Sequence, residues 1–290
     1  MEWYVFAFAC AIVGSISAVV EKKTLMKEHS MEFSTVFSIF NFIFVIPFLS
    51  YVDFSVLKEP YTMGFIYTTS VLGGLAFFYV AKGVRHMEIS VVSPLLNFGP
   101  AFLMLLAWIF LGEVLTLQQL VGVGIIIFGS YLLEISTKHP TLLGPVKKMI
   151  HSKYIHYIFI ALFLYGFSSL CDKIILGRIT PITYLVFVHF FIAVNFIILI
   201  HLFHNGFAGI KNGIRNAGKW ILLVSLLTCT YRYFQAQAVS MAYVSLVIPI
   251  KRTSTIFSTI IGGGLFHEKH LLKRVLCCVI MFFGAYLIIA

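Results

Sequence analysis

The chain is dominated by a succession of apolar runs, each about 17–25 residues long, which is the length that an α-helix needs to cross a bilayer. Only helices and closed β-barrels satisfy all their backbone polar groups in lipid, and barrel strands would alternate apolar and polar residues. The continuous runs therefore predict an all-α integral membrane protein. Ten transmembrane helices are expected, at residues 3–20, 33–51, 62–81, 89–111, 116–133, 155–172, 182–203, 218–239, 244–266 and 271–290.

Composition excludes an ordinary soluble domain. Of the 290 residues, 60% are hydrophobic and 11% are charged, and the mean hydropathy is +0.98. The net charge of +10 is spread through short loops, where it meets lipid headgroups, so membrane lipids are expected partners and nucleic acid is not. All five cysteines fall inside predicted spans without metal-ligand spacing, which predicts free thiols, no metal site and no cofactor.

Two segments of the chain repeat each other. FYVAKGVRHMEISVVSP (78–94) aligns with YFQAQAVSMAYVSLVIP (233–249) at an offset of 155 residues. Because each unit would contain five spans, an odd number, the second unit must enter the membrane inverted, as in many secondary transporters. The expected organisation is a first five-helix repeat at 1–135, a connecting loop at 136–154 and a second repeat at 155–290. The offset pairs Ala81 with Ala236, Val84 with Val239, Ser90 with Ser245, Pro94 with Pro249, Glu113 with Glu268, Gly129 with Gly284 and Tyr131 with Tyr286.

The segment SVVSPLLNFGPAFLMLLAWIFLGEVLTLQQLVGVGIIIFGSYLL (90–133) resembles the EamA-like transporters of the drug/metabolite transporter superfamily. The similar features are a proline in span 4, Leu111-Gly112-Glu113 before span 5 and a glycine-rich span 5. The second half repeats them more weakly, and the resemblance covers essentially the whole chain. It implies ten helices and transport by alternating access. It does not imply one substrate, since members carry metabolites, amino acids, sugars, nucleotide sugars and lipid-linked groups.

The positions of the charges are more informative than any motif. All eleven acidic residues are expected in loops or at helix ends, whereas Arg232, Lys251 and Arg252 fall inside spans 8 and 9. Each such cation costs about 2.5–3.5 kcal/mol on insertion scales. With no acid expected inside the spans, these side chains must face a wet cavity, extend to the headgroups, or bind an anion from outside the protein.

Polar neighbours favour a cavity over extension to the headgroups, which remains the alternative for Lys251. Thr228, Arg232 and Gln235 share one helix face, and Thr255 shares a face with both Lys251 and Arg252. The Lys251-Arg252 pair also resembles the sugar-phosphate and nucleotide-sugar branch, in which such a pair meets the substrate phosphate. The substrate-binding residues expected on this basis are Lys251, Arg252, Arg232, Gln235 and Thr255, with Asn97 and Tyr79 from the first half.

Two acids occupy matching places in the two halves, Glu21 at the end of span 1 and Asp172 at the end of span 6. A protonatable carboxylate there would couple transport to protons. The alternative is a headgroup-level pair with Lys22 or Lys173. Glu113 is expected to begin span 5, where an acid favours the helix dipole and caps free amides.

These features predict a secondary transporter in the cell membrane, a monomer or homodimer, that moves a small anionic solute, phosphorylated or carboxylated. Its two halves would rock around a midplane cavity lined by spans 3, 4, 8 and 9. The alternatives are a flippase for a lipid-linked phosphate, or a membrane receptor or intramembrane enzyme that transports nothing. No catalytic grouping stands out, so enzymatic activity is not expected.

The orientation of the chain is open. One set of loops holds fifteen basic residues and the opposite set holds three, which places both termini outside the cytoplasm by the positive-inside rule. The resembling family usually keeps both termini in the cytoplasm.

Overall fold

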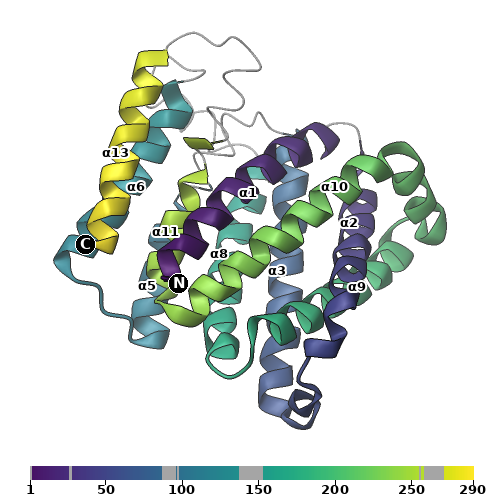
Figure 1. The fold of residues 1–290 in the computed structure, drawn as a ribbon. Coiled ribbons are helices and arrows are strands. Elements are labelled where there is room, and N and C mark those ends of the chain that lie inside the picture. Colours follow the sequence, from purple (N-terminus) through teal and green to yellow (C-terminus); the bar gives the residue numbers. More distant parts are fainter. Residues whose placement is uncertain are drawn as a thin grey trace.

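A computed structural model describes residues 2–25, 28–86, 96, 98–136, 153–254, 256–257 and 271–290. Within these ranges the regular structure is entirely helical, which confirms the predicted fold class, and each of the ten expected spans contains one described α-helix (Figure 1). The elements are α1 (Trp3–Leu25), α2 (Ser30–Val45), the short 3-10 helices η1 (Ile46–Tyr51) and η2 (Phe54–Lys58), α3 (Pro60–His86), α5 (Gly99–Leu111), α6 (Leu117–Ser136), α8 (Lys153–Leu176), α9 (Pro181–Phe203), α10 (Gly206–Met241), α11 (Val244–Arg252) and α13 (Leu271–Ile289).

Five of the described helices are long and apolar enough to cross a membrane, judged by length and composition. They span Trp3–Leu25, Ser30–Tyr51, Pro60–Gly83, Tyr154–Leu176 and Pro181–Phe203. Shorter apolar helices occur at Gly99–Leu111, Leu117–Leu132 and Leu276–Ile289. The protein is therefore an integral membrane protein, and its two termini lie toward the same end of the bundle (Figure 1).

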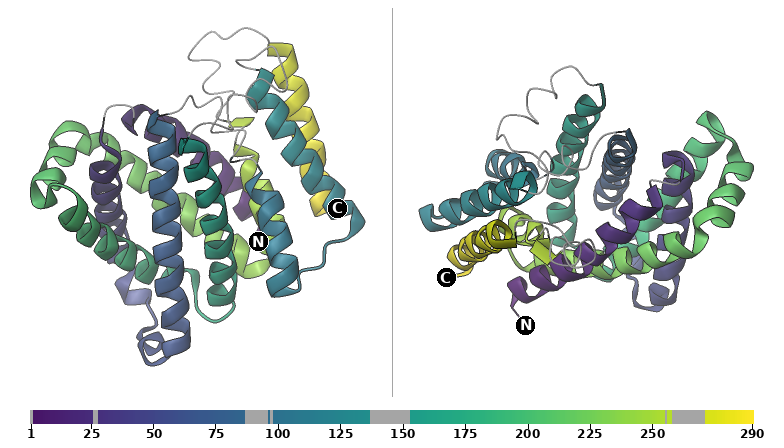
Figure 2. Two further views of the ribbon diagram at one scale, coloured as in Figure 1. Left: turned by 180° about the vertical axis from the view of Figure 1, so that it is seen from behind. Right: turned by 90° about the horizontal axis from the view of Figure 1, so that it is seen from above.

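The helix contacts show the inverted repeat directly. The sequence offset relates α1 to α8, α2 to α9, α3 to α10, α5 to α11 and α6 to α13. Contacts occur in matching pairs under this relation: α3 packs on α8 as α10 packs on α1, and α5 packs on α8 as α11 packs on α1. The pairs α2–α9, α5–α11 and α6–α13 map onto themselves. Figures 1 and 2 show α10 lying beside α1, with α6 and α13 side by side at one end of the molecule.

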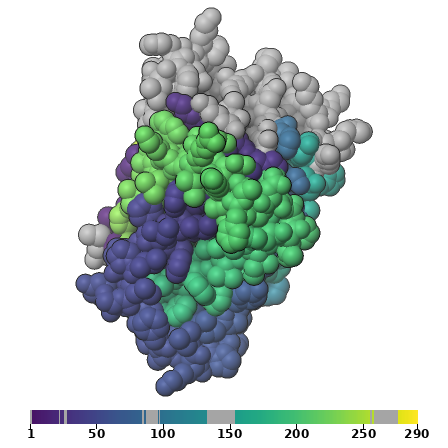
Figure 3. All heavy atoms as spheres, turned by 90° about the vertical axis from the view of Figure 1, so that its right-hand side faces the viewer, coloured from purple at the N-terminus to yellow at the C-terminus, as the bar shows by residue number. Residues whose placement is uncertain are grey.

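Helix α10 is longer than predicted. The sequence indicated a loop at 204–217, yet α10 begins at Gly206. The error arose because Lys211, Arg215 and Lys219 make this stretch look like a loop, although all three lie on its exposed side. The opposite side of α10 carries Gly209 and Gly213, which bring α10 close to α2. Figure 3, seen from the right-hand side of Figure 1, shows α2 and α10 next to each other at the surface.

Glycines also set the distance between α6 and α13. A Cβ atom added at Gly122 would lie 2.7 Å from the carbonyl oxygen of Gly284, and one added at Gly284 would lie 2.8 Å from that of Gly122. Small residues at such crossings let helix backbones approach closely in membranes. Gly124, two residues along α6, has no atom within 4 Å of its added Cβ. Close packing therefore occurs at Gly122 and not at Gly124.

This difference provides a matched test. We expect Gly122→Ala to destabilise the protein by about 1–3 kcal/mol, because the new methyl group overpacks the α6–α13 contact. Gly124→Ala should be neutral or slightly stabilising, since alanine favours helix by up to about 1 kcal/mol where there is room. Thermal unfolding of the two variants in detergent measures the difference, and equal melting temperatures would contradict the close contact.

Candidate functional site

A small polar cavity lies among α8, α9 and α10. It has about 10 Å³ of space open to the centre of a water molecule, which is room for about one water. This cavity is too small for a metabolite. Its lining comes from spans 6, 7 and 8, and the predicted cavity between spans 3, 4, 8 and 9 stays a prediction. The lining residues are Asp172, Leu176, Tyr184, Arg232, Gln235, Ala236 and Val239.

Arg232 projects from α10 into this cavity and meets a phenol. Its Nη2 atom lies 3.5 Å from the Tyr184 hydroxyl. On the other side, Tyr184 is in hydrogen-bonding contact with the carboxylate of Asp172. Within the described part of the chain, no carboxylate oxygen lies within 4.0 Å of the Arg232 guanidinium. Tyr184 therefore separates this cation from the nearest acid.

The location of Asp172 differs from the prediction for the acidic residues. All acids were expected in loops or at helix ends, but α8 continues to Leu176, so Asp172 lies inside the helix with 5% of its surface exposed. Its Oδ1 atom accepts a hydrogen bond of 2.6 Å from the Thr69 hydroxyl on α3. The expectation that no internal acid accompanies the intramembrane cations is therefore wrong. The predicted span was too short because its hydropathy falls at Asp172 and Lys173, whereas tertiary contacts carry the helix past them.

Lys251 points into the bundle. Its Nζ atom donates a hydrogen bond of 2.6 Å to Oε1 of Gln235 and lies 5.1 Å from the centre of the Tyr231 ring. Both partners belong to α10 and are uncharged. The alternative that Lys251 extends to the headgroups does not match this geometry.

Arg252 also faces the interior. A Cβ atom added at Gly99 would lie 3.4 Å from its Nη2 atom, which places the guanidinium at the first turn of α5. Tyr165 and Tyr231 interact electrostatically with the same side chain. The three intramembrane cations thus converge on one polar region at the crossing of α8, α10 and α11.

Glu21 lies half-buried on α1 and interacts electrostatically with the tyrosines Tyr165 and Tyr231. Among the described residues, the cluster thus contains three cations and two acids, and protonation of either acid would make its net charge more positive.

Of the remaining predicted site residues, one lines the cavity, one packs elsewhere, and two lie outside the described residues. Gln235 is buried and lines the cavity. Tyr79 stacks on Tyr157 with ring centres 5.4 Å apart, and Lys82 lies over the same ring, so in the described conformation Tyr79 belongs to an aromatic group on α3 and α8. Asn97 and Thr255 lie outside the described residues.

Sequence reasoning missed the tyrosines of this site. Tyr184 bridges Arg232 and Asp172, while Tyr165 and Tyr231 flank Arg252. Tyr231 could have been found from its place beside Arg232 in the chain. Nothing local singles out Tyr184 or Tyr165, because tyrosine is common in membrane helices and these two meet the cations only through tertiary packing.

Two charged side chains cap the helix ends at the turn between α10 and α11, Glu113 from the first repeat and Lys173 from the second. Glu113 was predicted to cap its own helix, but its carboxylate accepts bonds from the amides of Val244 and Ser245, at 3.0 and 3.1 Å, and from the Ser245 hydroxyl. It therefore caps α11. Lys173 donates to the carbonyl oxygens of Val239 and Ala242 at 2.8 and 2.7 Å, which caps α10. Lys173 is thus turned away from Asp172, and the proposed headgroup-level pair of these two residues does not form.

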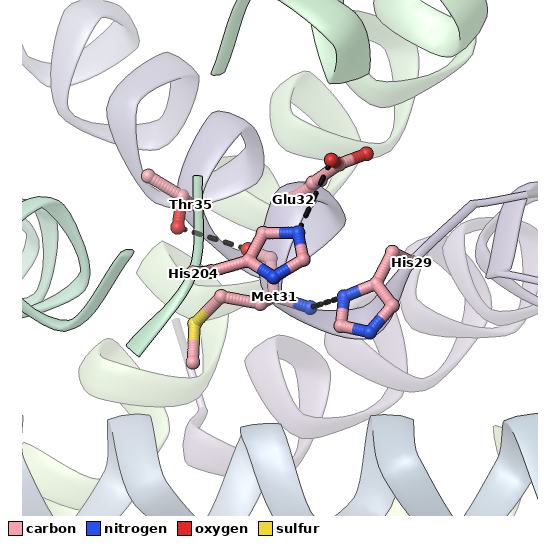
Figure 4. A network of polar contacts seen from close by, with 5 residues as sticks. All are labelled: His29, Met31, Glu32, Thr35 and His204. Carbon is pink, nitrogen blue, oxygen red and sulfur yellow. Dashed lines mark hydrogen bonds and ion pairs between the residues drawn. The ribbon is translucent and has the colours of Figure 1, made fainter. Parts of the chain in front are cut away.

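A second polar network lies at the start of α2. His204 contacts Glu32 at 3.2 Å, and the His204 and His29 rings stack with centres 4.5 Å apart (Figure 4). His29 accepts a bond from the Met31 amide and so caps α2. In the part of the chain that the structure describes, no three His, Cys, Asp or Glu side chains are grouped as metal ligands. We interpret this network as structural, because it fixes the α9–α10 turn against α2.

Comparison with known proteins identifies the class. The model of the EamA-like transporter family matches residues 1–135 and 152–290, so the chain belongs to the EamA-like transporter family, a family of membrane transporters. A protein known from its crystal structure shares the fold, with a TM-score of 0.75 over 98% of this chain and 95% of that protein, at 13% sequence identity.

One curated relative matches a shorter region. It is an uncharacterized protein, MJ1333.1 of Methanocaldococcus jannaschii, which is 43% identical over 67 residues. The match covers 23% of this chain and 46% of the relative, so the chain spans less than half the length of that protein.

The Glu113 cap leads to a stability prediction. Glu113→Ala should lower the free energy of unfolding by about 1–2 kcal/mol, since it leaves the first amides of α11 without their acceptor in a buried position. Hydrogen exchange at Val244 and Ser245 should accelerate in the same variant. Glu2→Ala is the control, because Glu2 is exposed and a change there should stay within about 0.5 kcal/mol. Equal effects of the two substitutions would rule out the cap.

Proposed function

We propose that the protein is a secondary transporter of the cell membrane that moves a small anionic metabolite, phosphorylated or carboxylated, by alternating access. The observation that carries this proposal is that three cations converge at the crossing of α8, α10 and α11, where Arg232 and Lys251 contact uncharged groups. Arg232, Lys251 and Arg252 face this interior region, and among the described residues Asp172 and Glu21 are acids that interact with it.

The partners of these cations support anion binding. Lys251 bonds an amide oxygen and lies over an aromatic ring, while Arg232 meets a phenol, so neither charge is cancelled by the group it touches. A guanidinium suits bidentate contact with phosphate or carboxylate, and an ammonium adds a point charge. An anion could replace these neutral contacts with stronger, charge-assisted ones.

The closed cavity supports alternating access. Room for about one water means that the helices must separate before a metabolite enters. The matching contacts of the two inverted repeats offer a route, because each repeat can adopt the arrangement that the other has in the described state. The caps at Glu113 and Lys173 would then hold one end of the pathway closed.

Transport in liposomes tests the proposal. The purified protein is reconstituted and assayed for counterflow of labelled inorganic phosphate, glycerol phosphate and malate. Lys251→Ala and Arg232→Ala should each reduce counterflow by about 10-fold to 100-fold, since a hydrogen bond to a charged group contributes about 1.5–3 kcal/mol. Lys211→Ala removes an exposed base from the same helix as Arg232 and should leave counterflow unchanged.

The other outcomes separate the alternatives. Movement of a lipid-linked phosphate without movement of soluble anions would favour a flippase that uses the same charges. Binding of the probes without flux would favour a receptor, and their chemical conversion would favour an enzyme. Full counterflow in both the Lys251→Ala and Arg232→Ala variants would contradict the assigned site.

A further inference from the structure

Asp172 and the anionic substrate that we propose would both interact with Arg232. The carboxylate is buried, and Arg232 and Lys251 are the charged groups that act on it electrostatically. Burying an unpaired carboxylate costs several kcal/mol, and the attraction of these two cations opposes that cost and favours the ionised form of Asp172. The same two side chains form the proposed anion site. Asp172 and a bound anion would therefore compete for the same positive charge.

The surroundings of Asp172 contain few other titratable groups. Helix α3 contributes the neutral hydroxyl of Thr69, and α5 has no titratable side chain. Lys173, the next residue in α8, is directed to backbone carbonyls. Among the residues that the structure describes, the titratable or charged groups that face Asp172 are Tyr184 from α9, Arg232 from α10, Lys251 from α11 and Cys171 from its own helix.

The hydroxyl groups beside Asp172 suit both of its protonation states. Thr69 Oγ1 lies 2.6 Å from Asp172 Oδ1 and 2.8 Å from the Ser168 hydroxyl, and either of these hydroxyls can donate to the other. Hydroxyl groups both donate and accept. Thr69 can therefore donate to the carboxylate, or accept from the carboxylic acid while it donates to Ser168, without movement of the backbone.

We infer that Asp172 is a proton-binding site that couples anion transport to protons, because the carried anion displaces Asp172 as the counterion of Arg232. The inference rests on the proposed function. When the anion binds Arg232, the uncompensated carboxylate takes a proton from the side that is open to water, and proton and anion are released together on the other side. One proton moves with each anion, so a monovalent anion moves without net charge.

Asp172 fits this role better than Glu21. Glu21 is half-buried, and the groups that it affects are the tyrosines Tyr165 and Tyr231. Asp172 is buried and reaches the guanidinium of Arg232 through one phenol. Loss of its counterion therefore exposes Asp172 to the larger cost of an unpaired buried charge.

Liposome assays test the inference in two stages. Counterflow of inorganic phosphate, glycerol phosphate and malate at equal pH first identifies an anion that the wild-type protein carries. An inward proton gradient should then drive accumulation of that anion, and a pH dye inside the liposomes should report proton entry with it. In Asp172→Asn, counterflow should remain measurable, while gradient-driven accumulation falls at least 10-fold and proton entry stops.

Two further variants sharpen the result. Asp53→Asn removes an exposed acid from a loop and should keep the coupling of the wild type. Asp172→Glu should restore at least part of the coupling, because it returns a protonatable group to the same place. Coupling that is lost in Glu21→Gln and kept in Asp172→Asn would overturn the assignment to Asp172.

A direct measurement on the wild-type protein covers the case in which Asp172→Asn fails to fold. Addition of the carried anion to the protein in weakly buffered detergent should raise the pH of the solution, by about one proton taken up per anion bound. Anion binding without proton uptake, or counterflow with no response to a proton gradient, would overturn the coupling and leave the proposed function standing. Absence of counterflow for every probe would overturn the proposed function itself.

Discussion

A charge inside the lipid-spanning region must be compensated within the protein, and this constraint organises the structure. Arg232, Lys251 and Arg252 each carry a cost that lipid cannot relieve. The bundle meets it by turning all three inward, where Tyr184, Gln235 and Asp172 gather around them. Because Arg232 and Lys251 contact uncharged groups, these two cations are held in place without being neutralised by the groups that they touch. An ion pair of ideal geometry would stabilise them more, but would leave less charge for a substrate.

The rest of the fold holds this cluster together. Matching contacts between the inverted repeats place α8 and α10 on either side of the cavity, and the Gly122–Gly284 contact joins α6 to α13 at one end of the molecule. Glu113 and Lys173 secure the turn between α10 and α11 from the first and second repeats. This turn leads directly into the helix that carries Lys251. The position of the ammonium group thus depends in part on Glu113, which lies more than a hundred positions away in the chain.

Membership of the EamA-like family defines the fold and the general activity, while the chemistry of the site has to define the substrate. The likeness to a solved structure at 13% identity extends to the fold alone. The cation cluster points to an anion, and the buried carboxylate beside it points to a coupled proton. Both proposals depend on Arg232, which would have Asp172 as a fixed counterion and the carried anion as a second one.

The sequence alone determined the class of structure. Apolar runs of spanning length can only be helices in lipid, the offset of 155 residues required an inverted repeat, and the placement of Arg232 and Lys251 inside spans indicated the site. Only the tertiary structure decided that Asp172 lies beside Arg232, that Glu113 caps α11 and that α10 begins at Gly206. The physical reason is that hydropathy is a local property, read along one segment, whereas a counterion or a cap is supplied by whichever helix packs alongside.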